Sequence, residues 1–274
     1  MAIAAVCLCV LLLGVLFAKD RSDGAVTTDI DQSSVQKLVK RIDKETVTAL
    51  ILPIDDLEIK LIKNTDGWSI DGDKGTPINK IMIDTLLEKI ELILALRDIG
   101  ERELADYGLD EPSRTVTLFA PGDKTVISFG NRAIGSNGYY FTLDGKKVYL
   151  ADESLYNAFS IEMSEIVALP SIKDYGEISS IAFKGSTAND TELIKAIENI
   201  AAEGFVDYRA KDESIYGLGE KETEITLSFS SGEVLSFSLG VGESDDFIYL
   251  TLDGSDAVYL IVADKNDILL RYMR

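Results

Sequence analysis

The amino-acid sequence predicts an α+β protein of two homologous modules, each a helix packed on an antiparallel β-meander, after one N-terminal transmembrane helix. Three observations lead to this prediction. The chain opens with an uncharged apolar run, a set of motifs recurs at a constant offset, and each copy places short alternating runs after a helical stripe.

The composition excludes several classes of protein. The 274 residues include 47 acidic and 27 basic ones, which gives a net charge of −20, and no histidine. Without imidazole, Ser-His-Asp catalysis, Cys-His catalysis and histidine-ligated metals are excluded. Both cysteines, Cys7 and Cys9, lie in the apolar run, so a disulfide scaffold or thiolate metal site in the folded part is excluded. The acidic excess argues against nucleic-acid binding, which needs clustered Lys and Arg.

The apolar run extends from Ala2 to Ala18 without a charge or a proline. At about 1.5 Å per residue, it is just long enough to span a hydrocarbon core. We interpret residues 1–18 as a transmembrane signal anchor. A cleaved signal peptide and a lipoprotein signal are the alternatives, and bulky residues before the cleavage position and before both thiols disfavour them.

The orientation of the anchor follows from two arguments that oppose each other. Lys19 and Arg21 come directly after the run, and the positive-inside rule would keep that side in the cytoplasm. Large domains, however, translocate largely regardless of charge. The leading apolar run and the absence of cysteine from the rest of the chain support the second argument. We therefore expect a single-pass protein of the cell membrane with the bulk of the chain outside the cytoplasm.

Residues 19–44 read as a stalk followed by a short helix. The stalk is polar, and Ser34 to Ile42 is predicted to form an amphipathic helix with Val35 and Leu38 on its apolar side. The folded part then divides into module 1, residues 45–170, and module 2, residues 171–274.

The internal repeat defines the two modules. Tyr107-Gly108-Leu109 recurs 109 residues later as Tyr216-Gly217-Leu218, and Asp144-Gly145 recurs as Asp253-Gly254 at the same offset. Ordered matches of this kind indicate a duplication, whereas a solenoid needs three or more units. We assign the Tyr-Gly-Leu triplets a structural role, because glycine adopts backbone angles forbidden to other residues while Tyr and Leu pack beneath a sheet.

Module 1 is predicted to begin with a hairpin, Thr46–Pro53 and Glu58–Ile70, that turns at Asp66-Gly67. A helix is then expected to start at Thr76-Pro77, with a hydroxyl cap and proline at the first helical position, and to carry its apolar stripe to Leu94. Four strands and a short closing helix follow: Arg114–Phe119, Lys124–Phe129, Gly138–Leu143, Lys147–Leu150 and Glu153–Phe159.

Module 2 repeats this order. We predict a counterpart of one strand of the leading hairpin, Ser179–Lys184, and a helix over Thr191–Ala202. The strands and the closing helix are then Glu222–Phe229, Glu233–Leu239, Phe247–Leu252, Ala257–Val262 and Lys265–Arg271.

No catalytic, cofactor-binding or metal-binding residue is predicted. Asp71-Gly72-Asp73-Lys74-Gly75 suggests a calcium loop, but it fails the EF-hand spacing, so we expect a solvated turn. Gly217-x-Gly219 lacks the strand-to-helix context of a dinucleotide site. Acidic residues are too numerous for the sequence to select a pair of glycosidase carboxylates.

The order of these motifs resembles a known family. The resemblance rests on a capped helix, Tyr107-Gly108-Leu109 followed by Asp110-Glu111-Pro112, the strand Thr115–Leu118, a strand ending in Gly130, Gly138-Tyr139-Tyr140, and Val148-Tyr149-Leu150 before a short helix. These features are similar to the bacterial DUF4340 family, a domain of unknown function. The resemblance covers most of Thr46–Arg274 and is weaker in module 2, where Gly219-Glu220-Lys221 replaces the proline-containing sequence.

The resemblance implies a location and a kind of partner. Members of the family are typically anchored by one N-terminal helix and are similar to accessory components of ABC-type transporters of the gliding-motility-auxiliary kind. We therefore expect a non-enzymatic extracytoplasmic accessory subunit of a membrane assembly, with protein partners in an ABC-transporter-type complex and no cofactor. The alternatives are an envelope polysaccharide-binding module, for which the strand aromatics are the motivation, and a carboxylate-based hydrolase.

Overall fold

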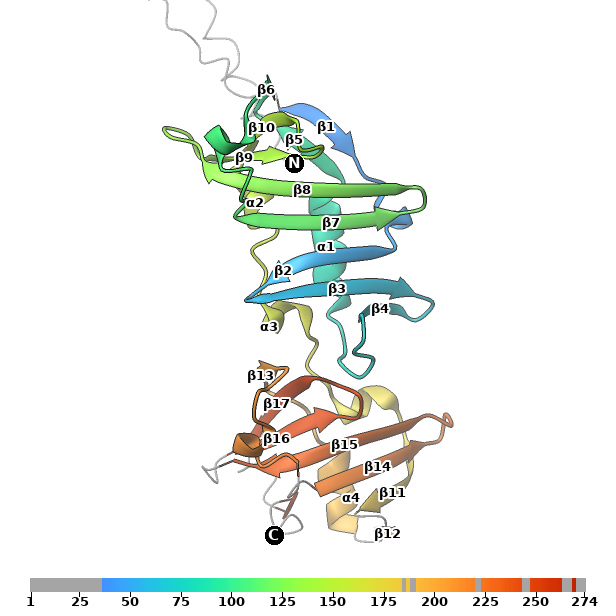
Figure 1. Cartoon of the computed structure of the whole chain (residues 1–274). Coiled ribbons are helices and arrows are strands. Elements are labelled where there is room, and N and C mark those ends of the chain that lie inside the picture. Colours follow the sequence, from blue (N-terminus) through green and yellow to red (C-terminus); the bar gives the residue numbers. More distant parts are fainter. Residues whose placement is uncertain are drawn as a thin grey trace, which may run out of the picture. The chain divides into compact units, whose positions relative to one another are not determined.

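The computed structural model describes residues 36–183, 186–187, 191–219, 223–242, 247–262 and 268–269 (Figure 1). Residues Gln36–Arg274 form one compact unit. The predicted anchor and most of the predicted stalk lie outside the described residues, so neither is tested. Among the helices that the structure describes, none is long and apolar enough to cross a membrane.

The described strands form three antiparallel sheets, and together with the helices they make an α+β fold (Figure 1). The smallest sheet pairs β1 (Lys37–Arg41) with β5 (Leu92–Ala95). The largest has the order β4-β3-β2-β7-β8-β9-β10-β6. Its strands are β2 (Ala49–Ile54), β3 (Leu57–Asn64), β4 (Gly67–Ile70), β6 (Arg97–Glu101), β7 (Arg114–Ala120), β8 (Asp123–Arg132), β9 (Gly138–Thr142) and β10 (Lys147–Asp152).

The third sheet belongs to module 2 and has the order β12-β11-β14-β15-β16-β17-β13. Its strands are β11 (Ile178–Phe183), β12 (Ser186–Thr187), β13 (Gly204–Tyr208), β14 (Thr223–Phe229), β15 (Val234–Val241), β16 (Phe247–Leu252) and β17 (Ala257–Val262). The predicted strands of both meanders are thus confirmed. In each module a strand ahead of the Tyr-Gly-Leu triplet, β6 or β13, pairs with the last meander strand and was not predicted.

The helices are shorter than the sequence predicted. They are α1 (Lys80–Ile90), α2 (Glu153–Asn157), α3 (Met163–Ile166) and α4 (Thr191–Glu198), together with the 3-10 helices η1 (Lys44–Thr46), η2 (Leu104–Tyr107), η3 (Ile172–Tyr175) and η4 (Glu213–Tyr216). The predicted closing helix of module 1 is present as α2. Of the corresponding helix in module 2, only residues 268–269 are described, and both are helical.

The predicted start of α1 at Thr76-Pro77 is wrong. Asn79 is the N-cap, because its Oδ1 accepts a hydrogen bond from the Met82 N–H at 3.2 Å. The end is also wrong, since Leu94 lies in β5 and not in the helix. The helical stripe is shorter than predicted because the apolar residues beyond Ile90 change to a strand alternation and pair with β1.

The short helix predicted over residues 34–42 is a strand instead. Leu38 lies opposite Leu94 in the antiparallel pair of β1 and β5, and Ile42 is buried just beyond the strand. Apolar residues at this spacing fit either structure, and the available partner strand decides between them.

Helix α1 packs on the eight-stranded sheet, which it crosses in Figure 1. Its buried residues Ile83, Leu86, Leu87 and Ile90 share a hydrophobic core with Leu50 of β2, Leu61 of β3 and Phe129 of β8. In module 2, Leu193 and Ile197 of α4 share the core with Ile225 of β14 and Phe237 of β15. Each module therefore buries one face of its sheet beneath a helix.

Candidate functional site

The two Tyr-Gly-Leu triplets form matching corners. Gly108 and Gly217 both have a φ of 68° and each ends a 3-10 helix, η2 or η4. The following leucines, Leu109 and Leu218, are buried. Because glycine adopts this left-handed backbone at little cost, the triplet turns the chain from the 3-10 helix toward the first meander strand.

A second glycine faces each corner. A Cβ on Gly130 would overlap the Tyr107 carbonyl oxygen, and a Cβ on Gly240 would overlap the Tyr216 carbonyl oxygen. The backbone of each triplet therefore lies against a glycine in β8 or β15. Sequence reasoning did not connect these positions, although Gly130 and Gly240 occupy equivalent places in the repeat.

The tyrosines of the triplets also make equivalent contacts. The ring of Tyr107 meets that of Tyr140 with centroids 4.7 Å apart, and Tyr216 meets Tyr249 at 5.0 Å. The Tyr216 hydroxyl additionally donates a 2.9 Å hydrogen bond to Asp207 Oδ2. Burial, together with the nearby Asp207 carboxylate, raises the pKa of Tyr216 to about 12.

The two Asp-Gly turns differ in their surroundings. Asp144 Oδ1 accepts hydrogen bonds of 2.9 Å from the backbone N–H groups of Lys146 and Lys147, and these bonds lower the pKa of its carboxyl group. Asp253-Gly254, by contrast, lies against a loop of module 1. The Gly254 carbonyl oxygen accepts a 3.0 Å hydrogen bond from the Gly75 N–H.

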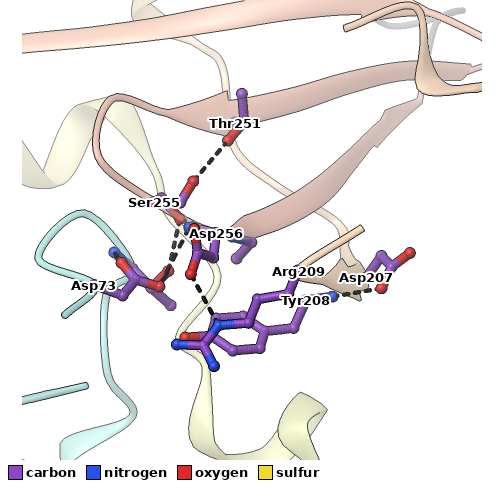
Figure 2. A network of polar contacts seen from close by, with 9 residues as sticks. Asp73, Asp207, Tyr208, Arg209, Thr251, Ser255 and Asp256 are labelled. Atoms are coloured by element: carbon purple, nitrogen blue, oxygen red, sulfur yellow. Dashed lines mark hydrogen bonds and ion pairs between the residues drawn. The ribbon is translucent and has the colours of Figure 1, made fainter. Parts of the chain in front are cut away.

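This contact is part of a partly buried polar joint between the modules, formed by Asp73, Gly75 and Thr76 on one side and residues 253–256 on the other. Figure 2 shows Asp73 beside Ser255 and Asp256. The Asp73 carboxylate is only 1% exposed. It accepts hydrogen bonds from the Thr76 N–H at 3.0 Å, the Thr76 hydroxyl at 2.6 Å and the Asp256 N–H at 3.2 Å. The solvated turn expected here is therefore wrong for Asp73.

The hydroxyl groups complete the joint. Thr76 Oγ1 lies 2.7 Å from Ser255 Oγ, and Ser255 Oγ accepts a 3.0 Å hydrogen bond from the Ala257 N–H. Since the Thr76 proton goes to Asp73, the Ser255 hydroxyl donates to Thr76. Gly75 fits closely beside them, because a Cβ there would overlap the backbone of the 253–255 turn.

Arg209 borders the joint on its solvent side. Its Nε lies 3.0 Å from Asp256 Oδ2, and its backbone N–H donates to the Asp256 carbonyl oxygen at 2.8 Å (Figure 2). The guanidinium carbon lies 5.2 Å from the centre of the Tyr208 ring. Both charged groups are partly exposed, so this ion pair contributes less than the buried hydrogen bonds.

Two tyrosine hydroxyls are buried beside Asp73. Those of Tyr208 and Tyr259 make no hydrogen bond of acceptable geometry to the described protein atoms. Burial raises the pKa of both groups, and the Asp73 charge adds to the effect. They remain protonated at neutral pH and place two donors in the low-dielectric part of the joint.

A backbone connection supports the joint. The Asn79 N–H donates to the Ile166 carbonyl oxygen at 2.8 Å, and the Ala168 N–H donates to the Pro77 carbonyl oxygen at 2.9 Å. The chain between the modules is thus held against the start of α1, and the Ile172 N–H then donates to Ile200 of module 2 at 2.9 Å.

The chemistry available at the joint is hydrogen bonding between groups of the chain itself. The Asp73 carboxylate already accepts three hydrogen bonds from the protein. Across the part of the chain that the structure describes, no three His, Cys, Asp or Glu side chains converge in a way that would hold a metal ion. The site is best understood as the element that fixes one module against the other.

Comparison with protein families gives one match. The model of the family described as "Domain of unknown function (DUF4340)" matches residues 68–168 and 183–271, which together make up more than half of the chain. The two matched segments correspond to the two copies of the repeat. Neither the curated proteins nor the solved structures contain a match to this chain.

Proposed function

The chain belongs to the DUF4340 family, and from that premise we propose that it is a non-enzymatic accessory subunit of a membrane assembly. In this proposal residues 1–18 anchor the chain in the cell membrane by a single pass, and both modules lie outside the cytoplasm. The assembly contains an ABC-type transporter. The apolar run Ala2–Ala18 and the resemblance set out above support these assignments.

The observation that carries the proposal is the joining of two family modules into one unit through partly buried hydrogen bonds around the buried Asp73. Asp73 and Gly75 of module 1 bond directly to Asp256 and Gly254 of module 2. A binding surface that is held in place before a partner arrives avoids an entropic cost on association. A two-module scaffold of this kind suits a subunit whose task is to bind other proteins.

The described carboxyl groups with a shifted pKa give no support to the hydrolase alternative. Glycosidase chemistry needs an acid whose pKa is raised, so that it stays protonated until it donates its proton. Among the described residues, the carboxyl groups with a shifted pKa have it lowered, chiefly by hydrogen bonds to the charged form. These groups are Asp98, Asp123, Asp144, Asp152 and Asp212.

The net charge of −20 fits a domain that stands away from the membrane surface. Anionic lipid headgroups repel an acidic domain, and the repulsion acts over roughly a Debye length, about 8 Å at physiological salt. The polar stalk predicted at the start of residues 19–44 would keep the modules beyond that distance.

The decisive experiment is affinity purification of the full chain, tagged at its C-terminus, from native membranes in a mild detergent. Mass spectrometry should find a transporter permease and an ATPase in a fixed ratio to the chain. Recovery of the chain without a permease or an ATPase would contradict the proposal.

A matched pair of variants tests the role of the two-module unit. Asp73→Ala removes the buried acceptor of the joint, whereas Asp71→Ala removes a half-exposed carboxylate from the same loop. We expect Asp73→Ala to reduce the recovery of the permease and Asp71→Ala to leave it unchanged. Equal recovery with both variants would show that the joint does not shape the binding surface.

The orientation is tested separately. Protease added to intact spheroplasts should digest the modules, whereas a cytoplasmic control protein should survive. Full protection of the modules would contradict the extracytoplasmic assignment.

A further inference from the structure

A groove at one end of module 1 contains the only tryptophan of the chain, Trp68. Its walls come from three elements: residues 63–68 of the β3–β4 turn, the exposed side of α1, and Lys44-Glu45 of η1. The groove has a volume of about 510 Å³, which is within the range of small-molecule sites.

The position of Trp68 follows from the register of the sheet. Trp68 lies directly opposite Lys63 in the antiparallel pair of β3 and β4, so both side chains are on the same face. That face carries the buried residues Leu61 and Ile70 two positions further into the sheet. The indole therefore packs partly against the hydrophobic core and remains partly accessible from the groove.

Polar groups surround the indole. Lys63 Nζ lies over the Trp68 ring, 6.0 Å from its centre, so it stands above the face of the indole that the groove exposes. Lys80, Asp84 and Glu88 occupy successive turns on one side of α1 and also line the groove. Lys44 and Glu88 form a 3.3 Å ion pair across the groove, while Asp84 and Lys80 are exposed.

The positive and negative charges that line the groove nearly balance, which disfavours a highly charged ligand. Three lysines and four acidic residues are interspersed, so the groove presents donors and acceptors of both signs around one apolar surface. An aromatic face with an adjacent polar rim suits a molecule that is apolar on one side and rich in hydroxyl groups at its edge. A pyranose ring has this shape, since its C–H face stacks on an indole while its hydroxyl groups bond to amides, carboxylates and ammonium groups.

We propose that the Trp68 groove binds an uncharged oligosaccharide, with one sugar ring stacked on the indole and its hydroxyl groups bonded by Lys63, Asp84 and their neighbours. The groove belongs to module 1. Strand β4 has no counterpart in the described part of the module 2 sheet, where β12 occupies the place that β3 holds in module 1. Within the described residues, the two modules thus share the same kind of corner, whereas the β4 wall of the Trp68 groove belongs to module 1. This inference is independent of the transporter proposal.

Trp68 serves as an intrinsic fluorescence probe of the groove, because all tryptophan emission of the chain comes from this residue. The full chain is purified in lauryldimethylamine oxide, a detergent without a sugar headgroup, and titrated with cellotriose, maltotriose and N,N′,N″-triacetylchitotriose. We expect at least one of them to produce a saturable shift of the emission maximum. Isothermal titration calorimetry with the same sugar should give one site per chain.

Variants assign the binding to the groove. Trp68→Ala should abolish the calorimetric signal, and Lys63→Met should weaken binding about tenfold through the loss of one charge-assisted hydrogen bond. Lys124→Met is the matched control, since Lys124 Nζ lies 5.7 Å from the Phe119 ring outside the groove. It should bind as the wild type does.

Asp84→Asn keeps the test valid if Trp68→Ala does not fold, because Asp84 is exposed on α1 and its amide replacement preserves the shape of the wall. It should weaken binding by a factor similar to that of Lys63→Met. The proposal is overturned if none of the three trisaccharides produces a saturable response in the wild type. It is also overturned if Lys63→Met and Asp84→Asn bind as tightly as Lys124→Met does.

Discussion

The buried Asp73 carboxylate of module 1 accepts a hydrogen bond from the backbone N–H of Asp256 in module 2, at a sequence separation of 183 residues. Asp73 is thereby both the acceptor that orders its own loop, through Thr76, and the acceptor that binds the second module. One carboxylate thus connects the local structure of module 1 to the position of module 2.

Removal of this carboxylate should destabilise the joint. Asp73→Ala leaves the buried N–H of Thr76 and the partly buried N–H of Asp256 without their acceptor. A fully buried group without a partner costs about 1–3 kcal/mol, and a partly buried one costs less. We expect the free energy of unfolding to fall by roughly 2–4 kcal/mol in a urea titration. Asp71→Ala, which loses only a half-exposed ion pair with Lys60, should change it by less than about 1 kcal/mol. A fall of the same size in both variants would contradict the role of Asp73.

Gly75 should tolerate no side chain. A Cβ at this position overlaps the backbone of the 253–255 turn, so Gly75→Ala forces the two modules apart or distorts the loop. Overpacking of this kind costs roughly 1–3 kcal/mol, measured as a lower midpoint of urea unfolding. Gly204→Ala in β13 is the control, because the nearest atom to its added Cβ is 4.0 Å away, and it should not lower the midpoint.

The two glycines that face the Tyr-Gly-Leu corners should respond alike. Gly130→Ala and Gly240→Ala each place a methyl group on the carbonyl oxygen of the facing tyrosine, and each should lower the free energy of unfolding by about 1–3 kcal/mol. Hydrogen exchange can locate the loss. The protection of backbone amides against exchange should fall mainly in β7 to β9 for Gly130→Ala and in β14 to β16 for Gly240→Ala. A large effect in one module with none in the other would show that the corners are not equivalent.

Alkaline pH should destabilise the chain through the tyrosines whose pKa is raised. The pKa of Tyr216 is raised to about 12, whereas an unfolded tyrosine has a pKa near 10. The stabilisation is therefore complete below about pH 10 and is lost as the pH rises toward 12, because the unfolded state releases its proton first. The burial of Tyr208 and Tyr259 acts in the same direction.

Chemical unfolding at a series of pH values measures this effect, and Tyr216→Phe isolates one contribution. The variant should show a shallower decline in stability between pH 10 and 12 than the wild type does. Identical slopes in that interval would mean that the Tyr216 hydroxyl is not held protonated by its surroundings.

Local sequence signals predicted the meanders well. The meander strands are short alternating or β-branched runs separated by Gly-containing turns, which is information carried within each hairpin. The repeat at an offset of 109 residues predicted the duplication, and the family match confirms the resemblance. The Tyr-Gly-Leu corners were predicted from the same repeat, because Gly108 and Gly217 recur within it and glycine indicates a special backbone angle.

Segments without a local signal were predicted less well. Residues 37–41 have apolar spacing that fits a helix or a strand, and only their pairing with β5 decides. Thr76-Pro77 has the composition of a helix start, but its hydroxyl is used by Asp73 and Ser255, so α1 begins at the next suitable cap, Asn79. In both cases the competing partner is far away in the sequence.

The sequence by itself determined the duplicated α+β architecture, the strand order within each meander and the glycine corners, because periodicity, turn chemistry and repetition act over short distances along the chain. Only the tertiary structure decided that Asp73 is buried, that Gly75 contacts Gly254, and that Trp68 shares a groove with α1. These relationships depend on contacts between segments that are far apart in the sequence. Asp73 and Gly75 have the composition of a solvated turn, but in the folded chain they bond to Asp256 and Gly254. Burial and close approach between distant segments have no signature in a single sequence.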